Sequence, residues 1–134
     1  MLLEILSDLV KIDDILLIIK NDGAVSEIRS NSLSIRQKEK WITIGDNDGP
    51  AHMHINSELI KSAEFVQEKK PDRTSFSVRF FNKNGERVLA TFFTKMYDES
   101  KTIISERRKV YDNMNQKYSS KIQFLKKNLS KKDK

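Results

Sequence analysis

The chain has 134 residues, of which 37% are hydrophobic and 33% charged, so it fits one domain with a moderate core. It contains no cysteine, which excludes disulfides, thiolate metal sites and thiol catalysis. The net charge of +6 comes from the end of the chain, because Lys117–Lys134 holds seven lysines and one aspartate. Residues 1–116 carry 18 basic and 18 acidic side chains. The high pI therefore does not by itself indicate a nucleic-acid-binding domain.

The N-terminal stretch MLLEILSDLVKIDD carries acidic residues and has no basic segment ahead of its apolar residues, unlike a secretory signal. The longest apolar run, Ile15–Ile19, is far shorter than the roughly 20 residues of a transmembrane helix. We therefore expect a cytoplasmic protein without a membrane span. We also expect a main domain at residues 1–116 and a basic segment at residues 117–134.

The first part of the chain predicts a short helix followed by antiparallel strands. Leu2–Leu9 has its apolar residues at helical spacing, and the next segments are short apolar or alternating runs separated by turn residues. Asn21-Asp22-Gly23 and Asn82–Gly85 are typical of hairpin turns. The polar stretch Ser30–Lys40 is either a loop or an edge strand. The expected strands are Ile15–Ile19, Ala24–Arg29, Trp41–Gly45, Ala51–Ile55, Lys61–Glu68, Thr74–Asn82 and Arg87–Met96.

From about Glu99 the hydrophobic period becomes helical and predicts a long C-terminal helix that continues to about Leu129. Ser119-Ser120 weakens this helix and could divide it. The apolar stripe consists of Ile104, Tyr111, Met114, Tyr118, Ile122, Leu125 and Leu129. Together the elements predict an α+β fold, in which helices cover an antiparallel twisted sheet of about seven strands.

The two histidines of the chain, His52 and His54, lie two residues apart on an expected strand, so both point to the same face. Such a pair can supply two metal ligands, although a stable site needs a third or fourth, and Asp46 and Asp48 lie nearby in sequence. In the simpler interpretation, the histidines form a solvated strand face opposite a buried Met53.

The basic segment Lys117–Lys134 mixes lysines with apolar and aromatic residues. Such a helix suits nucleic-acid phosphates, an anionic membrane surface or an acidic partner. Alternatively, its apolar stripe packs on the rest of the protein or on a second subunit, with the lysines in solvent.

The segment from Ile15 to Met96 resembles the haem-utilisation family known as HemS/ChuX/HutX, in particular one of its two repeats. The resemblance lies in the order of several pieces rather than in one motif. These are a Trp before a strand, a strand with His, Lys-Pro, a strand ending in Phe, a Gly-centred hairpin and a Phe-Phe strand. Here they are Trp41, His52, Lys70-Pro71, Phe81, Gly85 and Phe92-Phe93.

Only some of the family's haem-contacting residues have a counterpart in this sequence. His52 falls on the family's strand histidine, and His54 falls where the family usually has arginine. In the larger members a helical histidine and a hairpin arginine hold the haem iron. The helical histidine has no counterpart here, and Lys20 is the nearest match to the arginine. Of the family's final aromatic-Gln-Phe-Phe-Gly-x-Arg strand, only the phenylalanine pair is kept.

The resemblance implies a HemS-like fold and a protein that binds haem, or a related tetrapyrrole, for intracellular storage or delivery. It makes His54, and then His52, the candidate iron ligands, since imidazole is a common haem ligand. Lys20 and Lys95 are candidate partners of the propionates, and Phe93 is a candidate cofactor contact. No catalytic residue is predicted, and haem degradation is the enzymatic alternative considered.

Small family members resemble half of the larger ones, which implies a homodimer that completes the cofactor cleft. In the alternative interpretation the protein keeps the fold without haem. It then acts as an interaction module whose segment Lys117–Lys134 contacts nucleic acid or an acidic partner.

Overall fold

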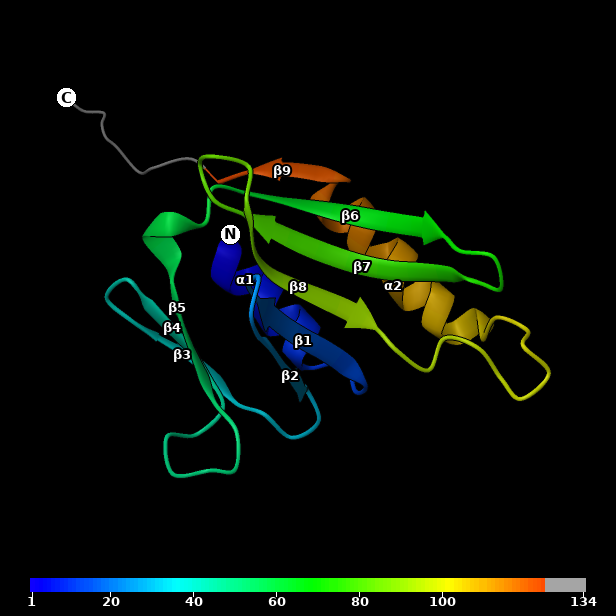
Figure 1. The fold of residues 1–134 in the computed structure, drawn as a ribbon, viewed down its shortest axis with the longest axis horizontal. Coiled ribbons are helices and arrows are strands. Elements are labelled where there is room, and N and C mark those ends of the chain that lie inside the picture. The colour runs from blue at the N-terminus through cyan, green and yellow to red at the C-terminus, as the bar shows by residue number, and fades with distance from the viewer. Residues whose placement is uncertain (125–134) are drawn as a thin grey trace.

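The computed structural model describes residues 1–124, which form two antiparallel sheets and two α-helices (Figure 1). The six-stranded sheet has the order β2-β1-β8-β7-β6-β9, and the three-stranded sheet has the order β3-β4-β5. In chain order the elements are α1 (Leu2–Val10), β1 (Ile15–Lys20), β2 (Val25–Arg29), β3 (Ile35–Lys38), β4 (Trp41–Ile44), β5 (Met53–Asn56), a 3-10 turn (Ser57–Leu59), β6 (Ser62–Lys69), β7 (Thr74–Phe81), β8 (Arg87–Phe93), α2 (Ser105–Tyr118) and β9 (Lys121–Gln123). The predicted α+β class with antiparallel strands is confirmed.

Both helices lie on the same face of the large sheet (Figure 1). The face is apolar because the central strands alternate, with Phe76 opposite Phe93 and Phe80 opposite Leu89 on β7 and β8. Tyr111 of α2 is fully buried between this face and the helix. Its ring meets three phenylalanine rings edge-on at 5.1–5.6 Å, and its hydroxyl donates to the carbonyl of Ser77 at 3.0 Å. Burial raises the pKa of Tyr111 well above its usual range.

Helix α1 forms because its apolar residues recur at helical spacing, and Leu2, Ile5, Leu6 and Leu9 are all buried. A polar cluster ties it to the end of α2. The hydroxyl of Tyr118 donates to the carboxylate of Asp8, and Lys117 Nζ donates to the same oxygen at 2.9 Å. Burial alone would raise the pKa of Asp8, but these hydrogen bonds outweigh it and lower that pKa. Burial and the bond to Asp8 raise the pKa of Tyr118 to about 12.

The C-terminal helix does not run unbroken to Leu129: it ends at Ser119-Ser120, the point at which the sequence could divide it, and residues 125–129 of the prediction lie outside the described residues. Helix α2 ends at Tyr118, because Ser119 takes a positive φ of 68° that no helix can continue. The chain then pairs with β6 as the short strand β9, which places Ile122 opposite Ala63 in the core. Ile122 thus belongs to the apolar stripe in sequence but is buried by a strand.

The prediction of about seven strands in one sheet is wrong, since residues 1–124 form nine strands in two sheets. One additional strand is β3, the polar edge strand within Ser30–Lys40. The other is β9, whose three residues are too few to show an alternating pattern. Within residues 1–124, neither helix combines the length and the apolar character required to cross a bilayer.

Candidate functional site

The two histidines lie on the outer face of the small sheet. Ile42, Ile44 and Ile55 point inward and are buried, whereas Thr43 and His54 pair with each other on the opposite face. Met53, expected to be buried, is half-buried. The alternation of the strand is that of the simpler interpretation except at Met53, and the outer face is more than a solvated surface.

Thr43 holds His54 in a defined orientation. The Oγ1 of Thr43 lies 2.9 Å from Nδ1 of His54, while Thr43 itself is only 8% exposed. Nε2 of His54 has no hydrogen-bond partner among residues 1–124. When Nδ1–H donates to the hydroxyl, Nε2 carries the lone pair that a metal ion needs. In that tautomer the imidazole can act as a ligand through Nε2.

His54 lines a groove of about 550 Å³, a volume within the range of small-molecule and cofactor sites. The groove has an aromatic wall, because Trp41 on the neighbouring strand lines it and is 43% exposed. It also has cationic walls from Arg36 and Lys38 of β3. The remaining lining residues are Glu39, Thr43 and Asn47. A flat apolar ligand with negative groups matches this combination of side chains.

The loop between β4 and β5 fixes the edge of this groove. Gly45 has a φ of +88°, and a Cβ there would lie 2.3 Å from the carbonyl oxygen of Ala51 and about 3.0 Å from His52. Its N–H donates to the carbonyl of Ser34 at 2.7 Å, and Arg36 donates to its carbonyl at 3.2 Å. Only glycine combines this backbone conformation with such a close approach. Gly45 thereby sets the position of His52.

His52 and His54 lie together, as predicted, with ring centroids 5.3 Å apart and an interplanar angle of 69°. His52 is exposed and precedes β5, and it is not among the residues that line the groove. Within residues 1–124, no group of three His, Asp or Glu side chains could hold a metal ion. The pair therefore suits a metal that arrives with ligands of its own better than a bare ion.

Of the other three predicted site residues, Phe93 and Lys20 belong to the large sheet and Lys95 follows its strand β8, and none of them lines the groove. Phe93 is buried on the helix face, where its ring meets that of Tyr111 at 5.1 Å. Lys20 is the exposed last residue of β1.

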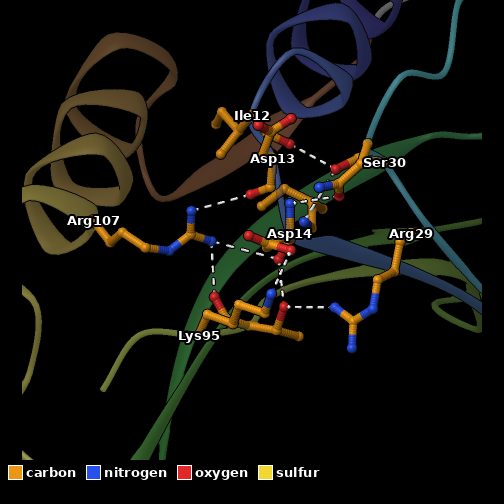
Figure 2. A network of polar contacts seen from close by, with 10 residues as sticks. Ile12, Asp13, Asp14, Arg29, Ser30, Lys95 and Arg107 are labelled. Carbon is orange, nitrogen blue, oxygen red and sulfur yellow. Dashed lines mark hydrogen bonds and ion pairs between the residues drawn. The ribbon is translucent and has the colours of Figure 1, made fainter. Parts of the chain in front are cut away.

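Lys95 belongs to a separate polar cluster that joins β1, β8 and α2 (Figure 2). Its Nζ lies 3.3 Å from the carboxylate of Asp14. Beside it, Arg107 donates to the backbone carbonyls of Asp13 at 3.0 Å and Thr94 at 2.8 Å. Because these bonds satisfy carbonyls at the ends of two strands, the cluster fastens the start of α2 to the sheet. Lys95 is thus engaged in a structural contact.

The basic segment is only partly described by the structure. Lys117 pairs with Asp8 at 2.9 Å and with Glu4 at 3.5 Å, and Lys121 lies 3.6 Å from Glu64. These two lysines therefore contact acidic residues of the same chain. The predicted surface for nucleic acid or an acidic partner otherwise falls on residues 125–134, which lie outside the described residues.

Sequence reasoning missed Trp41, Arg36 and Lys38 as companions of His54. The signal for Trp41 was present, because the alternation in WITI places Trp41 and Thr43 on the polar face of the strand. The signal for the two cations was absent, since Ser30–Lys40 shows no regular alternation and its pairing register is not visible in the sequence.

Solved structures share this fold. The chain superposes on the haem-binding protein ChuX with a TM-score of 0.71 and 15% identity, over 85% of this chain and 70% of that one. It superposes on holo-PhuS, a haem-binding protein from Pseudomonas aeruginosa, with a TM-score of 0.67 and 13% identity, over 83% of this chain and 31% of that one. It superposes on ChuS, an Escherichia coli haem oxygenase, with a TM-score of 0.65 and 17% identity, over 84% of this chain and 33% of that one.

The chain thus spans about a third of the length of PhuS and ChuS, and about two thirds of ChuX. No curated protein matches the sequence. A protein-family model matches residues 3–120, which include both sheets apart from β9 and both helices. The chain belongs to the HemS/ChuX haem-utilisation family.

Proposed function

We propose that this protein binds haem, or a related tetrapyrrole, in the groove on the outer face of the small sheet, for storage or delivery. The observation that carries the proposal is the state of His54: Thr43 holds its Nδ1, while Nε2 has no partner among residues 1–124. Haem iron already has four nitrogen ligands in the porphyrin. It therefore needs only one or two ligands from the protein, which a histidine without further metal ligands can provide.

The other groove residues suit the rest of a haem molecule. The exposed face of Trp41 can stack on a porphyrin ring, and Arg36 and Lys38 can pair with its propionates. One terminal amino group of Arg36 donates to the Gly45 carbonyl at 3.2 Å and lies 4.0 Å from Asp46, and the other N–H groups of its guanidinium are available to an anionic ligand. In this proposal these two residues take the place expected for Lys20 and Lys95. The structural relatives ChuX and PhuS, described as haem-binding proteins, support the same ligand.

A haemin titration followed by absorbance tests the proposal. We expect saturation at about one haem per chain or per dimer, with a sharp Soret band. His54→Ala should abolish this band. His52→Ala is the matched control, because it removes the same kind of side chain two residues away, outside the groove, and should leave the band unchanged. A linear rise without saturation, or an unchanged spectrum for His54→Ala, would contradict the proposal.

We also propose that two copies associate through the face of the large sheet opposite the helices. This face carries half-buried Leu16, Ile18 and Phe92 next to one another on β1 and β8. The Arg79 guanidinium lies 5.6 Å from the Phe92 ring and pairs with Glu68 at 3.1 Å, so polar groups border the apolar patch. Light scattering should give twice the 15.6 kDa chain mass, and Ile18→Glu should restore the monomer mass. A monomer mass for the unmodified protein would refute this association.

A further inference from the structure

A second cleft, of about 630 Å³, lies on the helix side of the large sheet, where β6 ends and β7 begins. The start of α2 and the turn between β6 and β7 meet at this end of the molecule (Figure 1). The cleft shares no lining residue with the groove that holds His54. Its lining residues are Gln67, Lys69, Thr74, Phe76, Tyr97, Ile103 and Arg108.

The apolar walls of the cleft are held in place by the backbone around them. Tyr97 and Ile103 face each other across an isolated β-bridge. The Tyr97 hydroxyl accepts from the N–H of Thr74 and donates to its carbonyl, both at 3.0 Å, so the ring is fixed at both ends. Phe76, which is only 1% exposed, closes the interior. A flat apolar group is therefore the shape that these walls can enclose.

Arg108 is arranged to receive an anion. Its Nε donates to both oxygens of Asp112, at 3.2 and 3.3 Å, and its guanidinium lies 5.0 Å from the centre of the Phe76 ring. Its terminal amino groups make no hydrogen bond with residues 1–124. Stacking on one side and an ion pair on the other fix the plane of the guanidinium, which lowers the entropy lost when it binds a carboxylate.

Lys69 supplies a second cation at the same cleft. It is the last residue of β6, and its side chain makes no ion pair within residues 1–124. The side-chain amide of Gln67, two residues earlier and on the same strand face, adds a further donor. The cleft thus has donors and positive charge around an apolar interior, and it contains no imidazole.

We propose that this cleft binds a small organic anion, namely a carboxylate carried on a flat apolar body. Arg108 and Lys69 receive the carboxylate, and the apolar body lies against Phe76, Tyr97 and Ile103. The site is distinct from the haem groove and does not depend on the function proposed there.

Naphthoate is a suitable probe, and an NMR titration of the whole chain locates its site. We expect saturable shifts of backbone amides in residues 67–76 and 97–108. Arg108→Gln and Lys69→Gln should each weaken binding by about tenfold, because a charge-assisted contact is lost. The matched controls Lys109→Gln and Lys70→Gln remove the same charge one residue away, outside the lining, and should leave binding unchanged. Naphthamide, which has the same ring and no charge, should bind more weakly.

Several results would overturn the proposal. One is a titration that does not saturate, and another is a set of shifts centred on Trp41 rather than on Phe76. If the control variants Lys109→Gln and Lys70→Gln lost as much affinity for naphthoate as Arg108→Gln and Lys69→Gln, the overall charge, and not the cleft, would attract the probe. His54→Ala must leave naphthoate binding unchanged. A failure of haem binding would thus not affect this result.

Discussion

Thr43 is expected to control the affinity of the groove for haem through its contact with His54. Thr43→Val keeps the shape of the side chain and removes only the hydroxyl that lies 2.9 Å from Nδ1. A hydrogen bond of this kind contributes about 1 kcal/mol, and its loss lets the imidazole rotate and change tautomer. Since about 1.4 kcal/mol corresponds to a tenfold change, the Kd for haemin should rise about fivefold.

The assay is a haemin titration of the unmodified protein, Thr43→Val, Thr43→Ser and His54→Ala under the same conditions. Thr43→Ser retains the hydroxyl and should bind nearly as well as the unmodified protein. Urea unfolding of each variant separates a loss of affinity from a loss of fold, because Thr43 is buried. An unchanged Kd for Thr43→Val, or a loss as complete as that of His54→Ala, would refute the role assigned to Thr43.

Four further predictions concern the fold that carries the site. Tyr111→Phe should lower the free energy of unfolding by about 1 kcal/mol and Tyr111→Ala by about 3–5 kcal/mol in urea titrations, because the first loses one hydrogen bond and the second a packed ring. Because the pKa of Asp8 is lower in the folded protein than in the unfolded chain, the Asp8 carboxylate stabilises the fold above pH 3.8. This contribution should disappear as the pH falls through the pKa of Asp8 in the folded protein. Acid unfolding of Asp8→Asn should not show this loss of stability. The raised pKa of Tyr118 should make stability fall between about pH 10 and 12, and Tyr118→Phe should show a smaller loss, the remainder coming from Tyr111, whose pKa is also raised. Gly45→Ala should destabilise the protein more than Gly85→Ala in thermal melts. Both glycines have positive φ, but an added Cβ is 2.3 Å from a backbone oxygen at Gly45 and meets nothing within 4 Å at Gly85.

The strands of the large sheet could be predicted because their local pattern agrees with their environment. Phe76, Val78 and Phe80 alternate with polar residues, and all three are buried against the helices. The turn at Asn82–Gly85 follows from its composition, and Gly85 has the positive φ that such a turn requires. In these segments local propensity and tertiary packing favour the same structure.

The end of α2 could not be predicted with the same certainty, because helical periodicity continues past the residue at which the helix stops. Ile122 is in phase with Tyr111 and Tyr118, yet it is buried by pairing with β6. The free edge of β6, which is far away in sequence, determines this outcome.

The same limit applies to the candidate site. The histidine pair is visible in the sequence, but its companions come from a neighbouring strand whose register depends on pairing. Thr43 faces both Arg36 and His54 across the small sheet. The resemblance to the family suggested Lys20 and Lys95, but Lys20 ends strand β1 of the large sheet and Lys95 follows strand β8, and neither lines the groove.

The order of strands in the two sheets has a consequence for the protein during its synthesis. The small sheet joins consecutive segments, so residues 35–56 can pair as soon as they leave the ribosome. In the large sheet β1 pairs with β8, which places Ile15 opposite Phe93. The edge of β1 that pairs with β8 therefore stays unpaired until most of the chain has been made, and during that time it can associate with other chains. The groove around His54 can be complete before that edge is closed.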